Sequence, residues 1–389
     1  MAKTVYKKKI KNGKEYYFYR LRHENLNKPK DLYASTVKEL ECKIKKAIHE
    51  LDNSLSSDNI TFGEFLKKWL FEIKFLKIKN MSKCLYEGAY RRYIKDSSIS
   101  KVKLKHINAA TIQTFINKLK RDNVSISMIK ATYLIISPCL KYAYDNNYII
   151  KDFTRSIILP SENEKTKLEK QNKIHAFTPE EQKQFINLIK NNKHECLYLT
   201  ALYSGLRQSE LLALTWNDID FENKTISVNK IARYQQIIKD GERANFETIV
   251  QTPKTKGSVR VVPIPDELVK VLKHHKSKNI EVCLKLGIKF KNSDLLFYGR
   301  NYNSYLTNTT IYIDFKRIAK KIRGEITFHD LRHTFATRLF ELNINAKTVQ
   351  KLLGHSTISM TLNIYTSVLQ KVENEATNKL NDLYKNMAN

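Results

Sequence analysis

The sequence predicts a mainly α-helical protein with small β-sheets, divided into three domains. Its 389 residues exceed the size of one ordinary domain. Apolar residues recur at helical spacing along most of the chain, and a few short β-branched or aromatic runs are typical of strands. Two polar stretches, DNSLSSDN at 52–59 and PSENEKTKLEKQNK at 160–173, indicate linkers. The expected domains are therefore residues 1–52, 60–160 and 174–389.

The first domain is predicted to be a β-hairpin followed by a helix. YKKKIKNGKEYYFYRL contains two strand patterns around Asn12-Gly13, a typical two-residue hairpin turn. Thr36 and Glu39 have the spacing of a capping box that opens the following helix. Residues 1–50 hold 14 Lys or Arg against six acids, and Tyr17 and Tyr19 share one strand face. We expect this basic hairpin to contact DNA, although such hairpins are also common as solvated surfaces.

The middle domain is predicted to be entirely helical. Thr61 and Glu64 form a second capping box, and further helical patterns cover 107–120 and 126–146. Pro138 lies inside the last pattern, so a kink or a break is expected there. The apolar residues of the first helix fall at helical spacing: Phe62, Phe65, Leu66, Trp69 and Ile73.

The third and largest domain is predicted to be helical at both ends with short strands between. Its first helix begins at Thr178, with proline at the first helical position. The strand patterns are KTISVNKIARY and RVVPIP, which flank the basic turn TPKTKGSVR. This part of the chain is therefore expected to be a mixed α+β domain.

The charge of the chain predicts a polyanionic partner. It contains 69 Lys or Arg against 39 Asp or Glu, a net charge of +30. Nucleic acid fits better than a membrane surface, because no apolar run approaches the roughly 18–20 residues of a spanning helix and no lipidation signal is visible. The five cysteines are far apart and form no C-x-x-C pair. This argues against a disulfide framework or a zinc knuckle and favours a reducing cytoplasm.

Sequence motifs for nucleotide and metal binding are absent. The chain has no phosphate-binding G-x-x-x-x-G-K-[ST] loop, no G-x-G-x-x-G and no H-E-x-x-H. If the protein cuts DNA, we expect it to do so without ATP, a metal ion or another cofactor.

Basic residues are the remaining candidates for chemistry. SGLRQSELL places Arg207 at a helix start, and FHDLRHTFATRL places His329 and Arg332 on one helix face. Arginine forks bind phosphate oxygens in pairs, and histidine moves protons near neutral pH. Each residue alone has a simpler explanation: an ion pair of Arg207 with Glu210, a helix cap at His329, a solvated cation at Arg332. Together with a tyrosine nucleophile, they favour a phosphate-binding site.

Three segments resemble the tyrosine recombinases, also called the phage integrase family. They are SGLRQSELLALTW, HDLRHTFATRL and LLGHSTISMTLNIYTSV, in the family's order and with its gaps over about 175–370. The two N-terminal domains resemble, more weakly, the arm-binding and core-binding domains of integrases from conjugative transposons and temperate phages. The Asn-Pro pair often found where the middle domain ends is missing from YDNNYIIKDFTRS.

The resemblance implies a role for each matching residue. Tyr365, ten positions after His355, is the nucleophile that forms a 3′-phosphotyrosine. Lys254 protonates the leaving oxygen, with Lys256 as the alternative because the length of the turn varies in the family. Glu210 is expected to hold Arg207 in place. The full set of expected catalytic residues is Arg207, Lys254, His329, Arg332, His355 and Tyr365.

The expected function is therefore site-specific integration and excision of a mobile element. The alternatives are a type IB topoisomerase and a non-catalytic DNA-binding regulator on the same fold. The expected partners are double-stranded DNA at core and arm sites, further copies of the chain in a tetramer, and an excisionase or host DNA-bending protein. A C-terminal apolar stripe is expected to pack on a neighbouring subunit, with packing on its own domain as the alternative: Val368, Val372, Ala376, Leu380 and Leu383.

Overall fold

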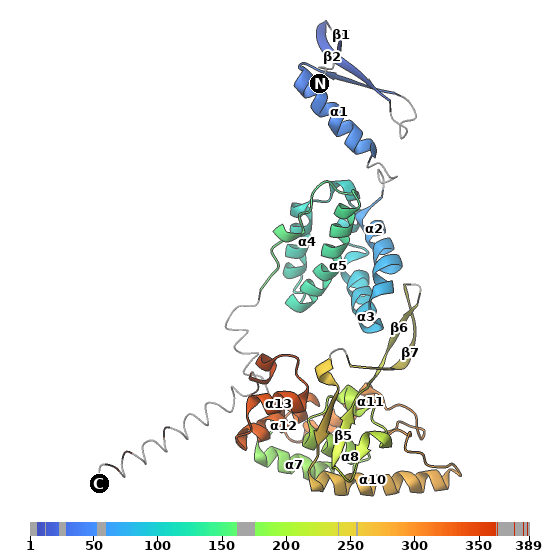
Figure 1. Cartoon of the computed structure of the whole chain (residues 1–389), viewed down its shortest axis with the longest axis vertical. Helices are drawn as coiled ribbons and strands as arrows, with labels where there is room; N and C mark the ends of the chain where they lie inside the picture. The colour runs from blue at the N-terminus through green and yellow to red at the C-terminus, as the bar shows by residue number, and fades with distance from the viewer. Residues whose placement is uncertain are drawn as a thin grey trace. The chain divides into compact units, whose positions relative to one another are not determined.

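The computed structural model describes most of the chain. The described residues are 6–11, 13–22, 29–52, 60–161, 176–239, 241–253 and 256–362, with 364, 377, 384 and 387 as isolated positions. Contacts divide the chain into two compact units (Figure 1). The first comprises Met1–Glu162 and Ile238–Arg243, and the second Asn163–Ile237 and Ala244–Asn389. The predicted linkers lie almost entirely outside the described residues, so the three-domain boundaries stay a prediction.

The first unit begins with a three-stranded antiparallel sheet followed by a helix. The order is β1 (Lys7–Lys11), β2 (Lys14–Leu21) and β3 (Lys30–Ala34), and α1 spans Val37–Asp52. Lys11 pairs with Lys14, so two residues form the turn, as predicted. Asn12 lies outside the described residues, and Gly13 has a φ of 75°. The strand β3 was not predicted.

The aromatic residues of β2 divide between the two faces of this sheet. Tyr17 and Tyr19 share a face, as predicted, and pack against the apolar cluster of α1, which includes Leu40. The other face carries Phe18, with the Lys9 Nζ atom 4.1 Å from its ring centroid. The predicted capping box at the start of α1 is only half formed: the Glu39 amide donates to Thr36, but its carboxylate accepts from Ser35.

The rest of the first unit is a helical bundle, as predicted. Its longer helices are α2 (Phe62–Lys68), α3 (Asn80–Ala89), α4 (Ala109–Arg121) and α5 (Ile126–Asp145). Short π and 3₁₀ segments join them: Trp69–Lys74, Phe75–Lys77, Tyr90–Ile94, Ser98–Lys101, Leu104–His106 and Thr154–Ser156. The capping box of Thr61 and Glu64 is present.

Pro138 does not interrupt the helix α5. The helix continues from Ile126 to Asp145 with the proline inside it. Proline has no N–H to donate to the carbonyl four residues earlier, which belongs to Leu134. Leu134 is on the exposed face of the helix, where the loss of one hydrogen bond leaves the helix continuous.

The second unit combines helices with a small antiparallel sheet of order β4-β5-β8. Its helices are α7 (Pro179–Ile189), α8 (Glu195–Ser204), α9 (Gln208–Leu211), α10 (Asp266–Lys285), α11 (Asn308–Ala319), α12 (His329–Glu341) and α13 (Ala346–Leu353). Its strands are β4 (Ile219–Asp220), β5 (Thr225–Val228) and β8 (Arg260–Pro263), with 3₁₀ turns at Trp216–Asp218 and Lys256–Ser258. The predicted helix start at Thr178 is confirmed, with a complete capping box.

A long hairpin extends from this unit. It consists of β6 (Ile231–Lys239) and β7 (Glu242–Gln251), and β7 was not predicted. Most of β7 is exposed, so the sequence lacks the alternation of a strand with one buried face. Its tip, Ile238–Arg243, belongs to the first unit.

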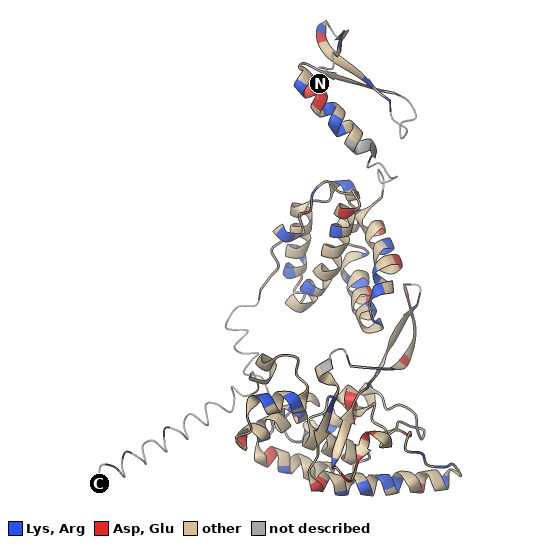
Figure 2. Cartoon of the chain, in the orientation of Figure 1, with Lys and Arg blue, Asp and Glu red and all other residues tan. Residues whose placement is uncertain are grey.

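Two hydrophobic clusters organise the second unit. The larger one surrounds α8 and includes Tyr198, Leu202 and Leu331. The smaller one joins α12 to α13 and contains Phe340, Leu353 and Ile364 with their neighbours. Lys and Arg are spread over both units (Figure 2). Among the described residues, no helix is both long and apolar enough to cross a bilayer. The mainly helical fold class with small sheets is confirmed.

Candidate active site

The turn between α8 and α9 places Arg207. Gly205 ends α8 with a φ of 63°, a left-handed conformation that favours glycine. A Cβ atom at this position would lie 2.4 Å from the Phe335 Cδ1 atom, so a larger residue would also collide with α12. Arg207 then occupies the N-cap position of α9, as the sequence predicted.

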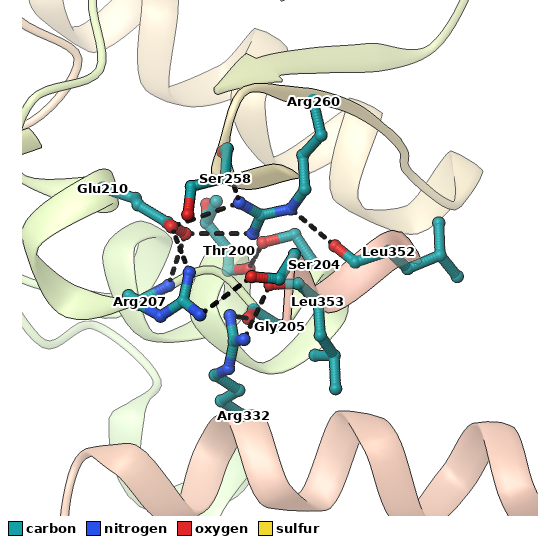
Figure 3. Close-up of polar contacts among 11 residues, drawn as sticks. Thr200, Ser204, Gly205, Arg207, Glu210, Ser258, Arg260, Arg332, Leu352 and Leu353 are labelled. Atoms are coloured by element: carbon teal, nitrogen blue, oxygen red, sulfur yellow. Dashed lines mark hydrogen bonds and ion pairs between the residues drawn. The ribbon is translucent and has the colours of Figure 1, made fainter. Parts of the chain in front are cut away.

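Glu210 and a main-chain carbonyl fix the Arg207 side chain (Figure 3). The Glu210 carboxylate accepts from the Arg207 NH1 group at 2.8 Å and from its backbone N–H at 2.9 Å. The NH2 group donates to the Gly354 carbonyl at 3.1 Å. The side chain of Arg207 remains 28% exposed, whereas that of Glu210 is 1% exposed. The guanidinium is therefore oriented but open to an external anion.

Arg332 is buried, with 2% of its surface exposed. Its NH1 group donates to the Gly205 carbonyl at 2.8 Å and its NH2 group to the Leu353 carbonyl at 2.7 Å. Burial and then the charge of Arg207 lower the pKa of Arg332, but a guanidinium stays protonated in proteins. Arg332 therefore joins the ends of α8 and α13 as a buried cation, and its interpretation as a solvated cation is wrong.

His355 follows the left-handed Gly354 at the end of α13. Its Nδ1 atom is 2.9 Å from the hydroxyl of the buried Thr361, which leaves Nε2 as the nitrogen that can reach a ligand. Burial and then the charges of Arg332 and Arg207 lower the pKa of His355 to about 3. His355 is therefore neutral at pH 7.

His329 is the first residue of α12. Its ring centroid lies 4.7 Å from that of His333, with the rings edge to face. Burial and then the charges of Arg332 and Arg207 lower the pKa of His329 to about 4. The same two arginines thus act on both histidines, which places the four side chains in one electrostatic environment. We call Arg207, His329, Arg332 and His355 the clamp.

Two of the six expected catalytic residues, Lys254 and Tyr365, lie outside the described residues. Lys256 begins a 3₁₀ turn, but its side chain is also outside the description. Ile364, directly before Tyr365, is 2% exposed and belongs to the cluster of α12 and α13. The chain therefore passes close to the helices of the clamp one residue before the expected nucleophile.

The clamp suits an anionic ligand. Among the described residues of this region, three guanidinium groups, those of Arg207, Arg260 and Arg332, accompany the single carboxylate of Glu210. Burial and then the positive charges of Arg332 and Arg207 lower the pKa values of the two histidines. No group of three side chains suited to hold a metal ion occurs in the part of the chain that the structure describes. A phosphodiester would offset this charge and accept hydrogen bonds from the arginines.

The sequence did not identify Arg260 or Thr361 as parts of this region. Arg260 belongs to a basic turn, where a buried arginine cannot be distinguished from the solvated lysines beside it. Thr361 contacts His355 from six residues away, from the helical turn of residues 358–362. By contrast, the ion pair of Glu210 with Arg207 follows from their spacing and is confirmed.

Family models match both the second unit and the helical bundle. The model of the phage integrase family matches residues 175–371. The model of the phage integrase N-terminal SAM-like domain matches residues 61–120. Together they cover the clamp and the helices α2 to α4.

Two relatives resemble the chain over most of its length. A XerC-like tyrosine recombinase of Caldanaerobacter subterraneus subsp. tengcongensis is 37% identical over 388 residues, covering 96% of this chain and 98% of the relative. The integrase of Staphylococcus phage L54a is 29% identical, covering 88% of this chain and 99% of the relative.

A solved structure supports the fold. The Tn1549 transposon integrase, in complex with transposon right end DNA, matches with a TM-score of 0.62 and 22% identity. The match covers 81% of this chain and 99% of that one.

Proposed function

This chain belongs to the phage integrase family of tyrosine recombinases, and we propose that its clamp holds a DNA phosphate for attack by Tyr365. It is a site-specific DNA recombinase, as the sequence motifs predicted. The named relatives are recombinases and integrases, which favours this function over the topoisomerase and the non-catalytic regulator. Double-stranded DNA is the substrate.

The convergence of the clamp carries this proposal. Residues far apart in the chain meet at the C-terminal ends of α8 and α13, where the carbonyls of Gly205, Leu353 and Gly354 orient the two arginines. Arginines held in this way pay little reorganisation cost when negative charge develops on phosphorus. Protein carbonyls and one carboxylate thus prepare a site for a pentacoordinate phosphate.

In the proposed reaction, the Tyr365 oxygen forms a bond to phosphorus and the bond from phosphorus to the 5′ oxygen breaks. The products are a 3′-phosphotyrosine and a free 5′-hydroxyl. Attack by a 5′-hydroxyl on the phosphotyrosine reverses the step and rejoins DNA. One phosphodiester replaces another, so the energy of the bond is retained and the step consumes no ATP.

Two proton transfers accompany this exchange. His329, neutral at pH 7 because its pKa is about 4, accepts the proton of Tyr365. Lys254 donates a proton to the departing 5′ oxygen, with Lys256 as the alternative donor on the same turn. His355 donates a hydrogen bond to a phosphate oxygen, and the negative phosphate raises the pKa of both histidines in the complex.

The proposal extends to assembly and localisation. The chain acts in the cytoplasm on a mobile element, with residues 1–52 bound to arm sites and residues 60–160 and 174–389 bound to the core site. Four copies assemble on two DNA duplexes, and the C-terminal stripe packs on the neighbouring subunit. An excisionase or a host DNA-bending protein sets the direction of recombination.

A nicked suicide substrate tests the chemistry. Wild-type protein should form a protease-sensitive covalent adduct with a DNA duplex that carries the attachment site. Tyr365→Phe removes only the hydroxyl, so it should bind this DNA with unchanged affinity and form no adduct. An adduct formed by Tyr365→Phe would assign the attack to another residue.

A further inference from the structure

Arg260 is a buried cation with a complete set of protein partners. Its side chain is 5% exposed. The NH1 and NH2 groups donate to the two Glu210 carboxylate oxygens at 3.1 and 3.0 Å, and Nε donates to the Leu352 carbonyl at 2.6 Å. NH1 also donates to the Ser258 carbonyl at 3.2 Å (Figure 3). A buried charge is tolerated only when it is paired and hydrogen-bonded in this way.

Glu210 connects Arg260 to Arg207. The Glu210 Oε1 atom accepts from both arginines, and Oε2 accepts from Arg260 and from the Arg207 backbone N–H. Burial opposes ionisation of this carboxyl, but the hydrogen bond and charge of Arg260 outweigh it and lower the pKa of Glu210. Without Arg260, the carboxylate would lose its bidentate partner and its fixed orientation, and Arg207 would lose its support.

Arg260 also contacts the segment that leads to His355. Its bond to the Leu352 carbonyl joins β8 to the last turn of α13. The approach is close: a Cβ atom on Gly354 would lie 3.0 Å from the Gly257 carbonyl oxygen and 3.1 Å from the Arg260 Cδ atom. The turn of Lys256–Ser258 therefore lies directly against the residue that precedes His355.

We propose that Arg260 is a positioning residue for DNA cleavage. It ties three parts of the active site together: Arg207 through Glu210, the segment before His355, and the turn Lys256–Ser258. This inference rests on the proposed function, because Arg260 holds in place groups that are needed for the attack of Tyr365 on DNA. Because its side chain is 5% exposed and its guanidinium donates to Glu210 and to two main-chain carbonyls, Arg260 acts through Arg207 and the segment before His355.

Arg260→Lys tests this role, because lysine keeps the charge but cannot bridge both Glu210 oxygens and the Leu352 carbonyl. We expect the single-turnover rate of adduct formation on the suicide substrate to fall about 10- to 100-fold, the scale of a small misplacement of catalytic groups. DNA affinity should stay within about threefold of wild type, since the positive charge of the surface is unchanged.

Arg338→Lys is a matched control. Arg338 is another arginine of the second unit, less buried than Arg260, that binds a carboxylate, that of Glu341, and a carbonyl, that of Phe177. Both variants should lose stability in urea, but Arg338→Lys should cleave at the wild-type rate. Equal cleavage losses in the two variants would reduce the role of Arg260 to general stability and overturn the inference.

A double-mutant cycle separates positioning from independent effects. If Arg260 acts through Arg207, the double variant Arg207→Lys/Arg260→Lys should cleave within about threefold of Arg207→Lys alone, because interacting residues are not additive. Losses that multiply would contradict this coupling. If Arg260→Lys does not fold, Glu210→Gln/Arg260→Gln removes both members of their buried ion pair together and takes its place, and wild-type cleavage by that pair would overturn the inference. Absence of any adduct with wild-type protein would instead refute the proposed function.

Discussion

Acid should destabilise the second unit through His329. Its pKa is about 4 in the folded protein and 6.5 in the unfolded chain. Below pH 6.5 the unfolded chain therefore binds a proton that the folded protein does not. The stabilising contribution of neutral His329 is complete above pH 6.5 and is lost as the pH falls toward 4.

The size of this loss of stability follows from the two pKa values of His329. Each pH unit in which the two states differ by one proton changes the free energy of unfolding by about 1.4 kcal/mol. Because His329 is exposed, solvent screening reduces this effect, and lowering the pH from 7 to 5 should cost on the order of 1 kcal/mol through His329. His355 acts in the same direction, because its pKa falls to about 3, but solvent screening at its partly exposed ring reduces its share.

Urea unfolding at pH 7 and pH 5 measures this effect. Trp216 is buried in the second unit, and Trp69 is the other tryptophan, so fluorescence in a Trp69→Phe background reports on the second unit. In that background His329→Gln should lose on the order of 1 kcal/mol less than the parent between the two pH values. His274→Gln, on α10 and outside the clamp, should behave as the parent does. Parallel pH dependence of the parent and His329→Gln would refute the reasoning.

Three further predictions concern DNA. Arg207→Lys keeps the positive charge but loses the planar guanidinium, so the single-turnover cleavage rate should fall at least about 100-fold with little change in DNA affinity. A cleavage rate near that of wild type would show that Arg207 is not part of the active site. A fragment of residues 60–389 should bind a core-site duplex with wild-type affinity but lose affinity for arm-site DNA. For arm-site DNA, the slope of log affinity against log salt concentration should become shallower by about 0.9 for each phosphate contact that is lost. Full arm-site affinity of the fragment would argue against a DNA-binding role of the N-terminal residues. Removing residues 370–389 should leave half-site binding intact and weaken synaptic complexes in gel-shift assays. If the truncated protein loses monomer stability as much as it loses assembly, the C-terminal stripe packs on its own domain instead.

Local patterns made part of the fold predictable. The two-residue hairpin turn, the helix starts at Thr61 and Thr178, and the ion pair of Arg207 with Glu210 depend on residues at most three apart. The helix α5 shows the limit of such rules, because Pro138 lies inside it without ending it. The strand β7 was missed because its exposed surface gives it no apolar alternation.

The sequence by itself determined the family, the mainly helical class and the order of the residues expected to act on DNA, because motif spacing and helical periodicity are local properties. Only the tertiary structure decided that Arg332 is a buried cation and that Arg260 shares the carboxylate of Glu210. Arg332 and Gly205 are 127 positions apart in the chain, Arg260 and Leu352 are 92 apart, and Arg260 and Glu210 are 50 apart. No pattern along the chain encodes the distance between such residues, which depends on how α8, α12, α13 and β8 pack. The same packing desolvates both histidines and brings two arginines near them, which together lower the pKa values of His329 and His355.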